Sequence, residues 1–298
     1  MTLIRLHTGL FLLFISISIL SCSKSNPAGS TLQSPATSLP DTSITMLNVA
    51  YGPDAKQVMD IYLPNGRHID TTKVIILIHG GAWIQGDKSD FDIAGLQNLF
   101  PGFAVFNINY RLATYNPIIN TFPTQELDVK AAVQFIYDHR TYYTISNNWA
   151  YLGLSAGGHL ALLQAYKYTT PIRPKVVIDF FGPTDMVDIY NAHANDNYLQ
   201  PILFILLSGT PSTNANLYAS SSPIAYANTS SPPTIILQGG QDTLVPYTES
   251  QRLHDTLTTL GVVNKYIFYP TQGHGFTGND LLNSLYETDS FLVNNISK

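Results

Sequence analysis

The stretch WAYLGLSAGGHLALLQAYKY, residues 149–168, decides the fold of this chain. An apolar run ends in a serine flanked by Gly153 and Gly157, and a helical pattern follows at once. This order predicts a strand over 149–154, a sharp turn at Ser155 and a helix over 156–168. In such a turn the neighbouring backbone comes so close that only hydrogen fits at the flanking positions. Ser155 would also lie at a helix N-terminus, whose positive end favours negative charge, and it is a candidate nucleophile.

Short strand-like runs alternate with helical patterns on both sides of this stretch. The clearest run is KVIILIH, residues 73–79, whose centre is apolar throughout, as in a strand buried on both faces. The alternation predicts one α/β domain with a mostly parallel, doubly wound sheet and helices on both faces. We expect further strands over 104–109, 176–180, 234–238 and 265–269, an antiparallel hairpin over 45–49 and 58–62, and helices over 124–137, 247–260 and 280–294.

One long segment, 184–228, interrupts the alternation. It is rich in Asn, Ala and Tyr and contains the hydrophobic piece PILFILL, residues 201–207, where a single helix should join two strands. Long insertions of this kind are usually functional, which predicts a small lid. The alternative is an additional packing helix.

The N-terminus has the pattern of an exported protein. A weakly basic start with Arg5 and His7 precedes an apolar run from Gly9 to Leu20, which is shorter than the roughly 20 residues of a membrane span. The run ends at Ser21-Cys22, which resembles the site where bacterial lipoproteins are cleaved and acylated. We therefore expect a signal peptide over 1–21 and a membrane-anchored lipoprotein, periplasmic or at the cell surface, that starts at lipidated Cys22. The alternative is an ordinary cleaved signal peptide.

Composition constrains the rest of the chain and its partners. Residues 22–44 are rich in Ser, Thr and Pro and predict a flexible tether, so the folded domain is expected over 45–298. Cys22 is the sole cysteine, which excludes an intrachain disulfide. The formal net charge is −5 and no Lys/Arg cluster is present, which argues against nucleic acid as a partner.

Donors for an oxyanion are expected in the loop HGGAW, residues 79–83, directly after the clearest strand. Glycines let such a loop turn its N–H groups toward a substrate, so Gly81 and Ala82 would act together with the N–H of Ala156. His79 is better interpreted as a residue that pins the loop than as a base.

The base and the acid are expected in two loops that each follow a strand. His274 lies between glycines in TQGHGF, residues 271–276, and Asp242 lies in GGQDTLVP, residues 239–246. The chain order Ser155, Asp242, His274 differs from the orders of chymotrypsin and subtilisin. Other candidates are less well placed, because they are expected in sheet packing, at the start of the insertion, on a solvent-facing helix surface or as structural carboxylates: His159, Asp179, Asp185, Asp188, His254 and Asp128. No ligand spacing indicates a metal, and no cofactor is expected.

Several of these motifs together resemble a known family. HGGAW (79–83) with GDK (86–88), NYRL (109–112), Phe122-Pro123 with Asp128, GLSAGGH (153–159), DTLVP (242–246) and GHGF (273–276) are similar to the bacterial feruloyl-esterase-like (BD-FAE) branch of the α/β hydrolases, which is related to the hormone-sensitive-lipase group. The resemblance covers most of the folded domain and implies an α/β-hydrolase fold. It also implies a Ser155–Asp242–His274 triad and an oxyanion loop at Gly81 and Ala82. One departure is Ala82, where a third glycine is expected; donation by its N–H is compatible with alanine if φ is negative.

These observations predict a serine hydrolase acting on short acyl or aromatic esters, including small-molecule or carbohydrate-linked ones, through an acyl-enzyme. Two alternatives remain. The same triad serves amide hydrolases such as formamidases or relatives of prolyl oligopeptidase. A surface lipoprotein could also use the fold for binding alone, without catalysis.

Overall fold

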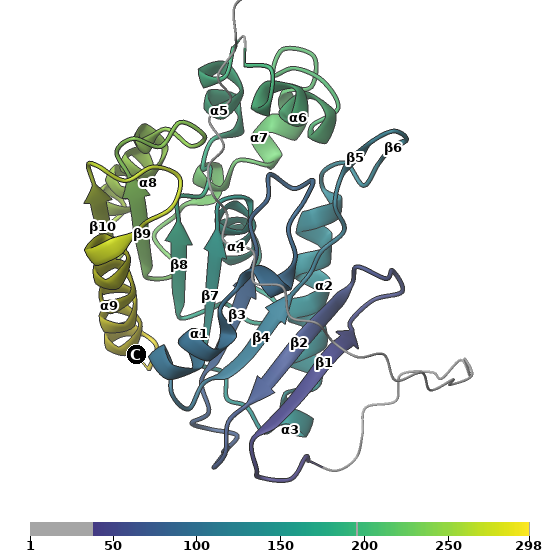
Figure 1. The fold of residues 1–298 in the computed structure, drawn as a ribbon, viewed down its shortest axis with the longest axis vertical. Helices are drawn as coiled ribbons and strands as arrows, with labels where there is room; N and C mark the ends of the chain where they lie inside the picture. Colours follow the sequence, from purple (N-terminus) through teal and green to yellow (C-terminus); the bar gives the residue numbers. More distant parts are fainter. Residues whose placement is uncertain (1–37, 195, 298) are drawn as a thin grey trace, which may run out of the picture. The chain divides into compact units, whose positions relative to one another are not determined.

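The structure is a computed structural model in which residues 38–194 and 196–297 are described. The predicted signal peptide (1–21), Cys22 and most of the predicted tether (22–44) lie outside these residues. The described part contains a sheet of eight strands (Figure 1). Their spatial order is β1 (Ile44–Ala50), β2 (Val58–Leu63), β4 (Ala104–Ile108), β3 (Val74–Ile78), β7 (Trp149–Leu154), β8 (Val176–Phe180), β9 (Thr234–Gly239) and β10 (Asn264–Tyr269).

The sheet is mixed but mostly parallel. β1 pairs antiparallel with β2, and β2 pairs antiparallel with β4. From β4 to β10 every neighbouring pair is parallel. The predicted α/β-hydrolase fold is confirmed, and each predicted strand is present to within one residue at either end.

Two hydrophobic clusters explain why the central strands are apolar throughout. In β3, Val74, Ile76 and Ile78 enter one cluster, whereas Ile75 and Leu77 enter the other. All five side chains are fully buried. Successive side chains of a strand point to opposite faces, so a strand covered on both sides shows no polar alternation.

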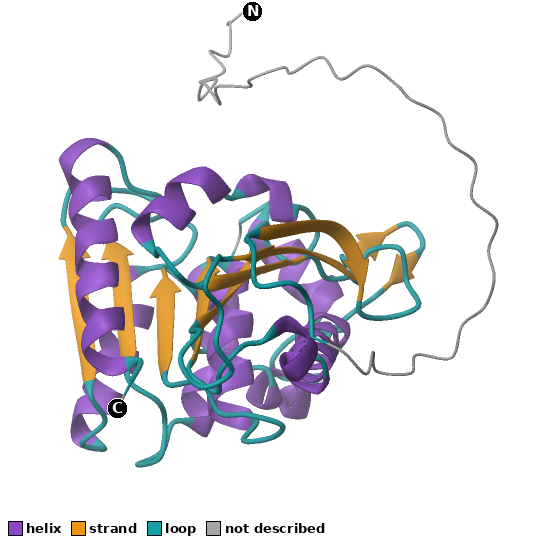
Figure 2. Cartoon of the chain, turned by 90° about the horizontal axis from the view of Figure 1, so that it is seen from below, coloured by secondary structure: helices purple, strands orange, loops and turns teal. Residues whose placement is uncertain are grey.

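Helices cover both faces of the sheet (Figure 2). The first cluster receives side chains from α2 (Thr124–Asp138), α4 (Ala156–Lys167) and α8 (Tyr247–Thr259), and the second from α1 (Ile93–Leu99) and α9 (Gly278–Asn295). The four predicted helices correspond to α2, α4, α8 and α9. The short helices α1 and α3 (Arg140–Tyr143) and the hairpin of β5 (Thr114–Tyr115) and β6 (Ile118–Ile119) were not expected from the sequence.

The insertion forms three short helices and a 3-10 turn beyond the carboxyl ends of β7 and β8 (Figure 1). These are α5 (Met186–Ala192), α6 (Leu199–Leu206), α7 (Ala215–Ser220) and the turn Pro223–Tyr226. In α6, Ile202, Leu203 and Leu206 are buried in the first cluster. Residues 201–207 therefore contribute to a helix that packs against the core, and the lid stays a prediction.

The folded domain begins upstream of the predicted boundary at residue 45. The N–H of Leu39 donates to the carbonyl of Tyr142 at 2.9 Å. Arg67 is only 5% exposed, and its guanidinium donates to the carbonyls of Pro40 and Thr42. Residues 39–42 are held by these bonds, so the predicted tether extends too far at its C-terminal end. Among residues 38–297, apart from 195, no helix is both long and apolar enough to cross a membrane.

Candidate active site

Ser155, His274 and Asp242 form one hydrogen-bonded chain at the carboxyl edge of the sheet. The Nε2 of His274 lies 2.8 Å from the Oγ of Ser155, and its Nδ1 lies 2.7 Å from Oδ2 of Asp242. Since an ionised carboxylate only accepts, Nδ1 carries the proton and the lone pair of Nε2 faces the hydroxyl. Ser155 directly follows β7. Asp242 lies three residues after the end of β9, and His274 lies five residues after the end of β10. This geometry allows His274 to take the Ser155 proton.

The turn at Ser155 has the strained conformation expected from the sequence. Its φ is 54° and its ψ is −119°, outside the regions that an L-residue ordinarily adopts. A Cβ on Gly153 would lie 2.1 Å from the carbonyl oxygen of Gly157, and a Cβ on Gly157 would lie 2.0 Å from that of Ile78. Both flanking positions therefore require glycine. The close approach of Gly157 to Ile78 also shows that the turn lies against the end of β3, where the loop 79–83 begins.

The carboxylate of Asp242 is fixed by bonds on both oxygens. Oδ1 accepts from the backbone N–H groups of Leu244 and Val245, each at 2.9 Å. Oδ2 accepts from His274 and, at 3.1 Å, from Nε2 of Gln238. The side chain is completely buried. Its orientation toward His274 is therefore set by neighbours that do not react.

Gln238 is a supporting residue that was not identified from the sequence. Its side chain is fully buried, and its Oε1 accepts from the hydroxyl of Ser250 at 2.8 Å. Its Nε2 donates to Asp242 and to the carbonyl of Val245. The feature of the sequence that could have indicated Gln238 is an amide side chain in β9, whose other side chains are Thr, Ile and Leu.

The imidazole of His274 packs against an aromatic side chain from β8's carboxyl end. The ring centroids of Phe181 and His274 are 4.6 Å apart. Phe181 itself has φ 45°, and its N–H donates to the carbonyl of Leu237 at 2.9 Å. The side chain of His274 is 19% exposed, so its imidazole is covered by Phe181 on one side and remains partly accessible.

The loop that is expected to supply oxyanion donors has an unusual backbone. Gly81, Ala82 and Trp83 have φ values of 108°, 50° and 62°. We expected donation by the N–H of Ala82 if its φ is negative, and the observed φ is positive. Within the described residues, no acceptor is assigned to the backbone N–H groups of Gly81, Ala82 or Ala156. They are free to donate to a substrate, and strain of this kind is typical of functional loops.

His79 pins this loop, in agreement with the interpretation of the sequence. Its ring stacks on that of Tyr110 with centroids 4.3 Å apart, and Nδ1 lies 2.7 Å from the carbonyl oxygen of Gly80. Burial lowers the pKa of His79, because the charged imidazolium is disfavoured away from water. In the described part of the chain, the ring of His79 makes no hydrogen bond to Ser155.

His159 has a different role from the one expected. We expected it in the sheet packing, but its ring bridges the loop at Trp83 and the insertion at Ser221. The indole N–H of Trp83 donates to its Nδ1 at 3.2 Å, and its Nε2–H donates to the carbonyl of Ser221 at 2.7 Å. Burial lowers the pKa of His159 to about 4, so the ring is neutral. It connects the loop at Trp83 with the insertion.

The remaining competitors have structural partners. Asp185 caps α5, and Asp128 forms a bidentate pair with Arg111. Asp179 is fully buried, accepts from the N–H of Gly182 and has a pKa raised by desolvation. His254 was expected on the solvent face, but it stacks on Tyr266 and bonds to Asn264. Asp188 pairs with Arg252.

Over residues 38–194 and 196–297, no three His, Cys, Asp or Glu side chains are grouped so that they could hold a metal ion.

Residues 59–257 match the model of the BD-FAE family. Among curated proteins of Mycobacterium tuberculosis (strain ATCC 25618 / H37Rv), the chain is 24% identical over 242 residues to Esterase LipC, covering 76% of this chain and 59% of LipC. It is 30% identical over 230 residues to the probable carboxylic ester hydrolase LipM, covering 72% of this chain and 51% of LipM. The chain thus spans only 51–59% of the length of these two relatives.

Solved structures show the same fold. The bifunctional GH43-CE of Bacteroides eggerthii superimposes with a TM-score of 0.71 and 28% identity, over 84% of this chain and 38% of that one. A truncated carbohydrate esterase from gut microbiota superimposes with a TM-score of 0.72 and 24% identity, over 88% and 99%. The second likeness concerns the fold alone. Because the family model spans most of the folded domain, including Ser155 and Asp242, this chain belongs to the BD-FAE family.

Proposed function

We propose that this protein is a serine hydrolase that cleaves carboxylic esters through an acyl-enzyme. The observation that carries the proposal is the continuous hydrogen-bonded chain from Ser155 Oγ through His274 to Asp242. Similarity to LipC and LipM, both described as ester hydrolases, supports an ester as the substrate. Family membership is consistent with the same chemistry.

The reaction follows from the roles of the three side chains. Ser155 Oγ attacks the ester carbonyl while His274 Nε2 takes its proton, and the imidazolium then protonates the departing alcohol. Asp242 holds the imidazole in the required tautomer and stabilises its positive charge. Water, deprotonated by His274, hydrolyses the acyl-enzyme and releases the acid. The N–H groups of Gly81, Ala82 and Ala156 stabilise the tetrahedral oxyanion, where each donor typically contributes on the order of 10²–10³ in rate.

The alcohol part of the substrate is proposed to be neutral, and carbohydrate is a candidate. Residues 197–241, which include α6 and α7 above the site, contain no Asp, Glu, Lys or Arg. The neighbouring stretch 112–125 is equally free of charged side chains, and Tyr115 and Tyr198 are 47% exposed. Such surfaces suit hydroxyl-rich, uncharged partners better than ionic ones. The similarity to the GH43-CE protein of Bacteroides eggerthii supports a carbohydrate-linked ester.

The location of the enzyme is a separate part of the proposal. The pattern around Cys22 supports export and lipidation of that cysteine, with residues 23–37 as a spacer to the domain. Labelled palmitate should enter the wild-type protein and not Cys22→Ser. Equal incorporation into both proteins would contradict the lipid anchor and leave the hydrolase proposal untouched.

Burst kinetics test the hydrolase proposal directly. Wild-type protein should release p-nitrophenol from the acetate ester with a burst of one equivalent per site, and Ser155→Ala should abolish it. A fluorophosphonate probe should label wild type and not Ser155→Ala. Parallel assays with N-formylkynurenine and a Xaa-Pro amide distinguish an amide hydrolase. Folded protein that neither turns over any of these substrates nor takes up the probe would indicate a non-catalytic binding protein.

A further inference from the structure

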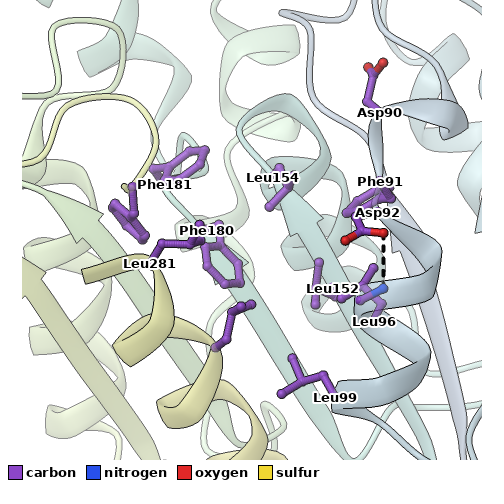
Figure 3. A pocket seen from close by; sticks show the side chains of 13 residues that line it. Asp90, Phe91, Asp92, Leu96, Leu99, Leu152, Leu154, Phe180, Phe181 and Leu281 are labelled. Carbon is purple, nitrogen blue, oxygen red and sulfur yellow. Dashed lines mark hydrogen bonds between the residues drawn. The ribbon is translucent and has the colours of Figure 1, made fainter. Parts of the chain in front are cut away.

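An apolar cavity of about 360 Å³ lies between α1 and α9, over β7 and β8 (Figure 3). Leucine and phenylalanine side chains dominate its lining. Leu96 comes from α1, Leu285 from α9 and Leu154 from β7. Specific small-molecule sites usually measure roughly 300–1,000 Å³ and are mostly apolar, so the cavity has the size and character of a binding site.

The cavity begins beside the reacting groups. Leu154, in its lining, directly precedes Ser155, and the N–H of Ser155 donates to the carbonyl of Phe180, another lining residue, at 2.9 Å. The ring of Phe181, also in the lining, packs 4.6 Å from that of His274. A substituent on a carbonyl held at Ser155 Oγ therefore has an apolar space within reach.

Two carboxylates belong to the lining of the cavity, and both are on exposed residues. Asp90 and Asp92 are exposed, and Figure 3 shows the Asp90 carboxylate directed away from the apolar side chains. Asp92 accepts from the N–H of Gly95, and Asp90 accepts from the N–H of Asp87. The remaining described lining residues, apart from Gly95, have hydrocarbon side chains. A phenol hydroxyl placed among them would lose its hydrogen bonds with water and gain none, which is unfavourable.

We infer that this cavity binds the acyl group of the substrate and that this group is an unbranched hydrocarbon chain of medium length. The inference rests on the proposed ester hydrolysis at Ser155. With about 30 Å³ for each water-sized group, the space accommodates on the order of ten such groups, far more than an acetyl group fills. Burial of each additional methylene strengthens binding about fourfold, so the cavity selects for chain length.

A series of p-nitrophenyl esters from acetate to octanoate tests the inference. The kcat/KM of wild type should rise at least tenfold from acetate to hexanoate. Leu285→Trp, which fills the cavity from α9, should lose this gain, measured as the hexanoate-to-acetate ratio of kcat/KM. Leu282→Trp, on the same helix but at a residue 65% exposed and outside the cavity, should keep the wild-type profile. Leu96→Phe, on the opposite wall, should repeat the effect of Leu285→Trp if that variant folds poorly.

The outcomes separate the two proposals. Acetate turnover with no dependence on chain length, or equal profiles for Leu285→Trp and Leu282→Trp, would overturn the acyl cavity and leave the hydrolase. Binding can also be measured without turnover, by calorimetry on Ser155→Ala. Octanamide should bind this variant at least tenfold more tightly than acetamide does. Adding Leu285→Trp to Ser155→Ala should abolish the difference. Loss of all ester turnover with retained octanamide binding would reject the hydrolase and keep the cavity. Absent octanamide binding would reject the cavity.

Discussion

The indole N–H of Trp83 donates to Nδ1 of His159 across 3.2 Å and so connects the loop 79–83 to α4, the helix that begins directly after Ser155. His159 in turn donates from Nε2 to the carbonyl of Ser221 in the insertion. A single buried, neutral imidazole thus connects the loop of the proposed oxyanion donors, the helix that follows Ser155 and the insertion 184–228. Two predictions follow from this arrangement.

Removing the indole donor should affect the chemical step more than substrate binding. Trp83→Phe keeps a buried ring but loses the bond that orients the loop, so we expect kcat on p-nitrophenyl acetate to fall about tenfold, a part of the effect of losing an oxyanion donor. KM should stay within about twofold. Trp149→Phe is the matched control, because that indole also donates from a buried position, to the carbonyl of Ser146 at 2.6 Å. A similar fall in kcat for both variants would contradict an orienting role for Trp83.

The neutral state of His159 should make the fold sensitive to acid. The pKa of His159 is about 4 in the folded state, below the roughly 6.5 of an unfolded histidine. Between these values the unfolded chain binds a proton that the folded chain does not, so the free energy of unfolding falls as pH decreases, by up to about 3 kcal/mol. Urea titrations at pH 7 and 4.5 should show a smaller decrease for His159→Gln, whose amide can accept from Trp83 and donate to Ser221. Parallel decreases would contradict the contribution of His159.

The strained backbone of Ser155 leads to a prediction about stability. In ordinary positions with negative φ, alanine is more stable than glycine by about 0.4–1 kcal/mol, because glycine has more freedom in the unfolded chain. At φ 54° and ψ −119° the order should reverse. We expect Ser155→Gly to be more stable than Ser155→Ala by about 1 kcal/mol in urea unfolding, with both variants inactive. If Ser155→Ala is the more stable, the turn relaxes without strain once Oγ is absent.

Much of the fold could be predicted because the hydrophobic period and the turn residues agree. The strands β3, β7 and β8 are apolar throughout since both faces are covered, and this pattern is visible in the sequence. The helix α1 was not expected, because it has only seven residues, contains Gly95 and buries none of its side chains completely. The hairpin of β5 and β6 has two residues in each strand, too few for a periodic signal.

The site residues that could be predicted are those in loops that follow a predicted strand. Ser155, Asp242 and His274 were expected from their loops, and the structure places His274 within hydrogen-bonding distance of both other residues. The supporting residues depend on contacts between distant segments. Gln238 is hydrogen-bonded to Ser250, and His159 is hydrogen-bonded to Ser221. No sequence motif links either residue to its partner. The positive φ of Ala82 likewise results from the path of the whole loop.

The last prediction concerns Asp242 and the tautomer of His274. In Asp242→Asn, the backbone N–H groups of Leu244 and Val245 will hold the amide oxygen, since they donate to Oδ1 in the wild type. The amide NH₂ then faces Nδ1 of His274, which must accept instead of donate. The proton moves to Nε2, and the imidazole can no longer take the proton of Ser155. We expect kcat to fall by about 10³–10⁴-fold.

Stability and structure distinguish this effect from a general loss of packing. Asp242→Asn should unfold in one cooperative transition, and its fluorophosphonate labelling should slow in parallel with kcat. Gln238→Leu is the matched comparison, because it removes one donor to Oδ2 but leaves the carboxylate and the tautomer intact. Its kcat should fall by about tenfold or less. If Asp242→Asn loses no more activity than Gln238→Leu, His274 does not depend on Asp242 for its tautomer, and the carboxylate contributes chiefly to the folding of the loop 239–246.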